Sequence, residues 1–134
     1  MFCDTQILTY QWWMEAVTDR DDFEGQNFSA SYYTCNLRDG KNLSDAYLAS
    51  NAELKLAHSK GSKSSSVLIR PASGTNAAEF PFDFVRLFTN PSFTNWGEAV
   101  DGWYDNVRGS AESNNVRDTY DCNGSTLFTG RIVR

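Results

Sequence analysis

The stretch from Phe80 to Asn90, FPFDFVRLFTN, decides the fold because it alternates like a strand and yet is apolar on both sides. A strand with one side in water shows a polar residue at every second position. Here only Asp83 and Arg86 interrupt the pattern: phenylalanines fill one side, and Val85 and Leu87 fill the other. The stretch therefore predicts a strand covered on both faces, and the rest of the chain has to supply the cover.

The composition limits the class of protein. A chain of 134 residues, 40% hydrophobic and 14% aromatic, is the size of one domain with a packed core. The net charge of −5 and the absence of clustered Lys and Arg argue against a nucleic-acid partner. No apolar run approaches the roughly 18 residues that a membrane span needs. The chain is cytoplasmic as written, but a secreted or periplasmic protein whose leader had been removed would look the same, so the localisation stays unknown.

Apolar spacing and turn residues predict the elements around this stretch. Asn42 and Asp45 are placed for a capping box, and Gly61 ends that helix. Pro71 predicts that its strand runs along an edge of the sheet. The predicted elements are a helix at 7–20, a strand at 28–37, a helix at 42–61, strands at 65–72 and 79–90, a helix at 92–107 and a strand at 125–133.

From residue 28 the order is strand, helix, strand, strand, helix, strand, which is the ferredoxin-like βαββαβ arrangement. The sequence thus predicts an α+β domain at 28–134, preceded by an N-terminal helical extension at 1–27. Both later helices are expected on one face of a four-stranded antiparallel sheet. A second sheet or the N-terminal helix is then needed to bury the other face.

Five segments carry a resemblance to a known group. They read CNLRDGKNLSDA, VLIRPA, FDFVRL, WGEAVDGWYDN and YDCNGSTLF, and they lie between residues 35 and 128. From residue 28 to 134 the chain resembles the dimeric α+β barrel superfamily, which includes the antibiotic-biosynthesis-monooxygenase-like proteins, and within it an uncharacterised, mostly marine bacterial group. The resemblance implies a homodimer in which two sheets face one another, with a small-molecule pocket between each sheet and its own helices.

Three functions follow as hypotheses. The first is a homodimeric barrel that binds a small, largely apolar molecule or serves as a stable scaffold. The second is a cofactor-independent monooxygenase or isomerase acting on an aromatic or polyketide-like substrate, and the third is an interaction module whose apolar sheet face meets a different chain. The candidate pocket residues are Tyr33, His58, Arg70, Asp83, Trp96 and Trp103.

Each of these candidates also has a structural interpretation. A histidine at the end of a helix, as His58 is, favours a solvated position near the helix C-terminus. Asp83 is expected to pair with Arg70 or Arg86 rather than to act as a base. A tryptophan at helical spacing, as at Trp96 and Trp103, is more often a core residue than part of a ligand pocket.

The three cysteines, Cys3, Cys35 and Cys122, match no zinc pattern, and the only histidine in the chain cannot form a His-rich site. No metal or cofactor is therefore predicted. Cys35 and Cys122 fall on strands predicted to be antiparallel neighbours, so their ends can meet. They form either a disulfide or two buried thiols side by side.

Overall fold

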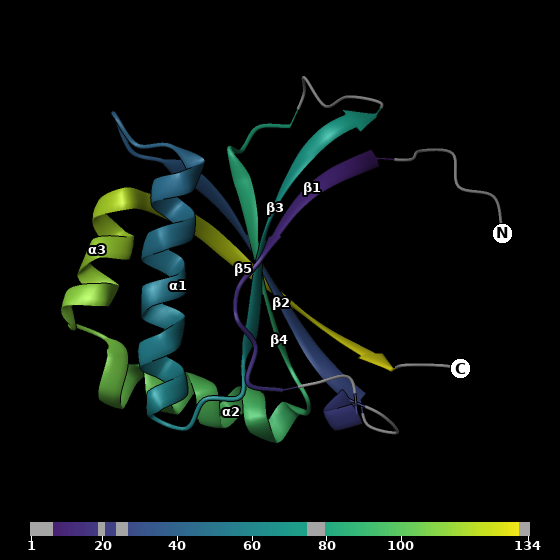
Figure 1. Cartoon of the computed structure of the whole chain (residues 1–134). Helices are drawn as coiled ribbons and strands as arrows, with labels where there is room; N and C mark the ends of the chain where they lie inside the picture. The colour runs from purple at the N-terminus through teal and green to yellow at the C-terminus, as the bar shows by residue number, and fades with distance from the viewer. Residues whose placement is uncertain (1–6, 19–20, 24–26, 75–79, 132–134) are drawn as a thin grey trace, which may run out of the picture.

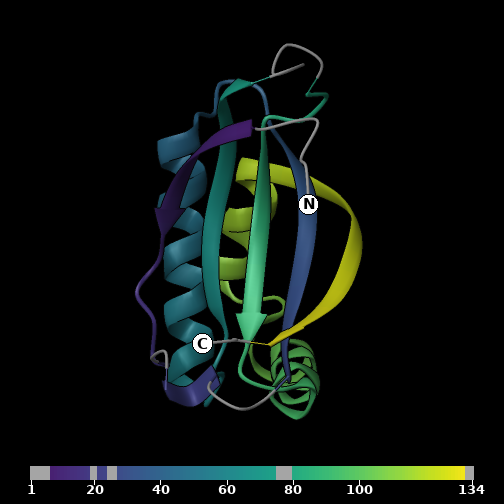
Figure 2. The same ribbon diagram turned by 90° about the vertical axis from the view of Figure 1, so that its right-hand side faces the viewer.

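A five-stranded antiparallel sheet forms one layer of the molecule, in the computed structural model that describes residues 7–18, 21–23, 27–74 and 80–131. The order of strands across the sheet is β1-β3-β4-β2-β5, and Figure 2 looks onto the face away from the helices. The strands are β1 (Ile7–Trp13), β2 (Asn27–Leu37), β3 (Ser65–Gly74), β4 (Phe84–Asn90) and β5 (Tyr120–Arg131).

The α-helices lie together on the other face of the sheet (Figure 1). Asn42 and Asp45 form the predicted capping box at the start of the first helix, and Gly61, at φ 94°, lies just beyond its end. Ser92 and Ser110 accept backbone hydrogen bonds at the starts of the next two. The helices are α1 (Leu43–Ser59), α2 (Phe93–Gly102) and α3 (Ala111–Thr119), with a π-helical turn η3 (Trp103–Val107) between the last two and a short 3₁₀ turn η1 (Asp21–Phe23) before β2.

The strand register separates the two faces of the sheet. Tyr33 of β2 lies opposite Arg86 of β4, and Cys35 lies opposite both Phe84 and Cys122. Because side chains alternate along a strand, these residues all face the helices. The core lies between them and α1, and comprises Met14, Cys35, Ala46, Leu54, Leu68, Phe84 and Tyr120.

The face away from the helices is only partly covered. The turn η1 lies at one end of it, where Phe23 contacts Phe28 edge to face at a centroid separation of 5.9 Å. Elsewhere Tyr32 and Phe128 contact one another and stay exposed. The predicted homodimer through this face stays a prediction, since the structure contains one chain.

The fold class predicted from the sequence is wrong. The sheet has five strands where four were expected, and residues 7–13 form strand β1 where a helix was expected. A third helix, α3, was not predicted. The ferredoxin-like βαββαβ arrangement with an N-terminal helix therefore does not describe this chain.

Strand β1 also corrects the predicted position of Pro71. The strand that contains Pro71, β3, lies inside the sheet between β1 and β4. Pro71 lies opposite Thr9, beside the register shift between Leu8 and Thr9. A proline has no N–H to donate and is tolerated at such an irregularity, here beyond the last pair that β3 makes with β4, at Ile69.

Candidate functional site

A cavity of about 730 Å³ lies between the sheet and the helices. One side of it, called here the aromatic wall, consists of Trp96 of α2 with Trp103 and Tyr104 of η3. The opposite side, called here the sheet floor, comes from the helix-facing positions of β2 and β4. The sheet floor consists of Ser31, Tyr33, Arg86, Phe88 and Asn90.

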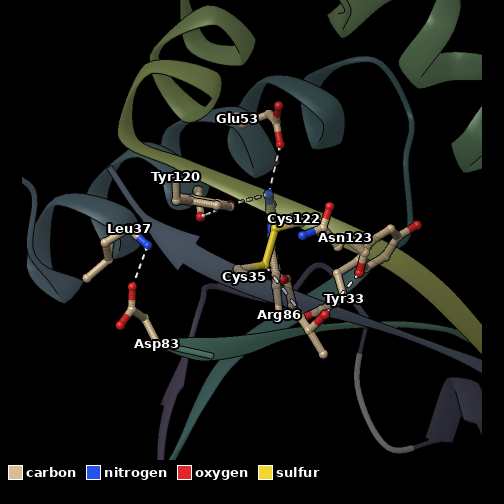
Figure 3. Close-up of a disulfide and its surroundings, with 12 residues drawn as sticks. Tyr33, Cys35, Leu37, Glu53, Asp83, Arg86, Tyr120, Cys122 and Asn123 are labelled. Atoms are coloured by element: carbon tan, nitrogen blue, oxygen red, sulfur yellow. Dashed lines mark hydrogen bonds and ion pairs between the residues drawn. A yellow bond between two sulfur atoms is a disulfide. The ribbon is translucent and has the colours of Figure 1, made fainter. Parts of the chain in front are cut away.

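Arg86 is the central residue of the sheet floor. Arg86 lies on the same side of β4 as Phe84 and Phe88, two residues from each, so its side chain points toward the helices. Its Nη1 donates to Oε1 of Glu53 at 3.1 Å and to the hydroxyl of Tyr120 at 2.8 Å. Figure 3 shows the guanidinium reaching past the disulfide to these two partners. Arg86 of β4, Glu53 of α1 and Tyr120 of β5 thus form a polar cluster that is buried at the edge of the cavity.

The charge of Arg86 is set by this cluster. Burial disfavours the charged guanidinium and acts to lower its pKa, whereas the oxygen of Tyr120 and the carboxylate of Glu53 act in the opposite direction. The partners prevail, and the pKa of Arg86 lies above its ordinary value. Arg86 is therefore a permanent buried cation, with its ring neighbour Phe88 centred 4.3 Å from Cζ.

One nitrogen of this cation is left without a partner. Nη2 of Arg86 has almost no accessible surface and makes no hydrogen bond within the described residues. Only the long 3.5 Å contact from Nε to Ser66 Oγ supplements the bonds of Nη1. An unpaired donor on a buried charge is costly, and it marks a place where an acceptor would be stabilising.

A row of small polar residues continues the sheet floor toward one end of the sheet. Ser64 Oγ donates to Oδ1 of Asn90 at 2.8 Å, and both residues are almost fully buried. Ser31, 3% exposed, also lines the cavity. The sheet side of the cavity therefore carries buried polar groups beside Tyr33 and Phe88, whereas α2 and η3 supply the aromatic wall.

A disulfide borders the cavity beneath the Arg86 cluster. The structure joins Cys35 of β2 to Cys122 of β5 across 87 residues of chain. Cys35 lies in the core, and Cys122 lines the cavity. Cys3 lies outside the described residues.

Three of the six residues predicted for a pocket line this cavity, namely Tyr33, Trp96 and Trp103. His58 lies outside it, where its Nε2 is 2.7 Å from the carbonyl oxygen of Ser64. Arg70 is exposed on β3 and does not line the cavity either.

The predicted pairing of Asp83 with an arginine is wrong. Asp83 precedes β4, is exposed, and its Oδ2 accepts a hydrogen bond from the backbone N of Leu37 at 2.7 Å. Arg86 pairs with Glu53 instead. Asp83 therefore forms a hydrogen bond with the end of β2 and lies away from the cavity.

Sequence reasoning did not place Glu53 and Tyr120 at a site. Arg86 did give a signal, because a charged residue between two phenylalanines on one side of a strand must be buried with a partner. Nothing in the spacing of Glu53 or Tyr120 identifies them as that partner, since the contacts span 33 and 34 residues of sequence.

Comparison with protein-family models, with curated proteins and with solved structures finds no match to this chain. The resemblance to the dimeric α+β barrel superfamily thus stays a prediction. Within the described ranges, no helix is long and apolar enough to cross a membrane. The same residues bring no three His, Cys, Asp or Glu side chains together in a metal-binding group.

Proposed function

We propose that the chain binds a small organic molecule in the cavity between the sheet and the helices. The ligand's apolar rings would lie on the aromatic wall, and a polar acceptor would face the sheet floor. The observation that carries the proposal is the cavity itself, in which three aromatic side chains face a floor containing a buried, incompletely paired arginine.

The dimensions of the cavity support this proposal. Binding sites for small molecules are usually concave, measure about 300 to 1,000 Å³, and combine apolar walls with a few polar groups that orient the ligand. This cavity, at about 730 Å³, lies within that range. The buried polar groups Ser31, Arg86 and Asn90 lie together on the sheet floor, so they favour a ligand with a polar end rather than a wholly apolar one.

The composition of the floor also supports a ligand rather than a purely structural core. Ser31, Asn90 and Arg86 are buried along the same side of two adjacent strands. An apolar residue at each position would stabilise the sheet–helix interface without desolvating polar groups. Polar side chains at these positions are therefore better suited to recognition than to packing.

The test is titration with 6-propionyl-2-(dimethylamino)naphthalene, a neutral ketone whose emission moves to the blue in an apolar site. We expect saturable binding with a blue shift. Ala99→Phe on α2 would fill part of the cavity, because Ala99 lines it. This variant is expected to weaken binding of the probe by about tenfold or more. Such a loss corresponds to one ring of the probe that can no longer pack in the cavity.

The matched control places the same side chain elsewhere. Ala52 is exposed on α1 and does not line the cavity, so Ala52→Phe should bind as the unmodified protein does. Equal binding by both variants would show that the probe sits outside the cavity, and the proposed function would then have to be abandoned.

A further inference from the structure

Resting on the proposed function, we infer that the ligand is uncharged where it meets Arg86, and that Glu53 is the residue that selects a neutral acceptor such as a ketone, ester or amide carbonyl over a carboxylate. A buried arginine in a cavity at first suggests an anionic ligand. The immediate surroundings of Arg86 argue the other way.

The charge of Arg86 is already balanced. Glu53 lies 3.1 Å from it, and both side chains are less than a tenth exposed, so the attraction between them is weakly screened. An incoming carboxylate would give this buried group a net negative charge. A carbonyl oxygen would satisfy Nη2 and leave the charge of the group unchanged.

The second oxygen of Glu53 strengthens this discrimination. Only Oε1 takes part in a hydrogen bond or ion pair among the described residues, and Glu53 itself lines the cavity. A ligand carboxylate at Nη2 would therefore lie near a second carboxylate in a poorly solvated place. Two like charges in such a place repel strongly.

Two arginines near the cavity do not reverse this balance. Arg108 and Arg117 line it together with Asp121, but all three are exposed. Charges in contact with water are screened within about 8 to 10 Å at physiological salt, so they contribute little to the energy of a group at the sheet floor. The buried pair decides the preference, and the net charge of −5 acts in the same direction.

The unpaired nitrogen gives the site its polar anchor. Because Nη2 has almost no accessible surface, an acceptor reaches it only when a side chain of the sheet floor moves aside. Tyr33, opposite Arg86 on β2, is half-buried, and its hydroxyl makes no hydrogen bond within the described residues. The ring of Phe88 lies 4.3 Å from Cζ of Arg86 and packs edge to face against Tyr33. A joint movement of these two rings would open this path without the loss of a side-chain hydrogen bond.

The experiment compares two probes that share a ring system. One is 6-propionyl-2-(dimethylamino)naphthalene, and the other is 6-(dimethylamino)-2-naphthoate, which carries a carboxylate in place of the ketone. At pH 7 the unmodified protein should bind the ketone about tenfold more tightly or better, because of the repulsion from Glu53. Glu53→Gln keeps the shape and removes the charge, and this variant should prefer the naphthoate.

A matched control separates Glu53 from a general change in charge. Glu15→Gln removes one negative charge from the exposed pair with Lys55 and should leave the ratio of the two affinities unchanged. If Glu53→Gln does not fold, the ratio in the unmodified protein still decides the matter.

The outcomes distinguish this inference from the proposed function. Tighter binding of the naphthoate by the unmodified protein would overturn the selection by Glu53 while leaving a ligand site in place. An unchanged ratio in folded Glu53→Gln would do the same. Failure of both probes to bind would overturn the proposed function and this inference with it.

Discussion

Arg86 and Glu53 form a buried ion pair between the sheet and α1, with Nη1 and Oε1 3.1 Å apart and side-chain exposures of 6% and 9%. The pair joins α1 to β4, and both residues line the cavity. Because Tyr120 shares the same nitrogen of Arg86, three elements depend on one guanidinium. The stability of the fold and the chemistry of the cavity are therefore linked through this residue.

Removal of Glu53 should destabilise the protein strongly. Glu53→Ala leaves the buried cation Arg86 without its counter-charge, which typically costs about 3 to 5 kcal/mol in the free energy of unfolding. Denaturant unfolding followed by circular dichroism measures this loss. Glu15→Ala breaks the exposed pair with Lys55, 3.6 Å apart, and should cost less than about 1 kcal/mol. Similar losses in the two variants would contradict the buried pair.

The hydroxyl of Tyr120 should contribute measurably to stability. It lies 2.7 Å from Ser50 Oγ and 2.8 Å from Nη1 of Arg86, and Tyr120 is 3% exposed. Tyr120→Phe keeps the ring in the core and leaves both partners short of a bond, which should cost about 1 to 3 kcal/mol. Tyr104→Phe, at an exposed position, should change stability by no more than about 0.5 kcal/mol. If Tyr120→Phe left the free energy of unfolding unchanged, the cluster would have to be open to water.

The disulfide should be a major source of stability. It closes 87 residues of chain, and a loop of that length corresponds to about 4 kcal/mol in the chain-entropy account. We expect the double variant Cys35→Ala with Cys122→Ala to have a lower melting temperature than the unmodified protein. A reductant should lower the melting temperature of the unmodified protein to a similar value. The reductant should leave the double variant unchanged, and Cys3, present in both proteins, cancels in this comparison. Two free thiols at Cys35 and Cys122 in unreduced protein would contradict the bond.

Residues that cap or end a helix predicted that helix correctly, because they act on the backbone next to them. The capping box at Asn42 and Asp45 and the glycine at Gly61 predicted α1, because they fix the backbone at each end of a helix. The expected last strand begins earlier, at Tyr120, and continues past Asn123–Gly124. Asn-Gly is typical of a turn, but at Asn123–Gly124 the strand has a register shift opposite Tyr32 and Thr34, with Gly124 at φ 60°.

The wrong prediction at the N-terminus has a tertiary cause. The spacing of Leu8, Trp12 and Met14 fits a helix, whereas the composition ILTYQWW at 7–13 is rich in strand formers. The open edge of β3 settles the choice, because seven residues of β1 pair with it. Such a pairing depends on residues about 60 positions away in the sequence, which no local pattern reveals.

The site was predictable only in part, for the same reason. The aromatic residues Trp96 and Trp103 follow from helical spacing, and Tyr33 from its strand. The partners of Arg86 depend on how α1 and β5 pack on β4, which is a property of the assembled fold. Burial of Arg86 was foreseeable, but Glu53 as its partner was not.

Binding of a ligand between the aromatic wall and the sheet floor is tested by the four tryptophan indole signals in a ¹H–¹⁵N spectrum. Each signal is assigned by a single Trp→Phe variant, and the neutral naphthyl ketone is then added. Trp96 and Trp103 line the cavity, whereas Trp13 is exposed on the other face of the sheet, opposite Val67. We predict that the indole signals of Trp96 and Trp103 shift with saturation while that of Trp13 stays in place. A shift of the Trp13 signal with those of Trp96 and Trp103 unmoved would place the ligand on the outer face of the sheet and rule out binding in the cavity.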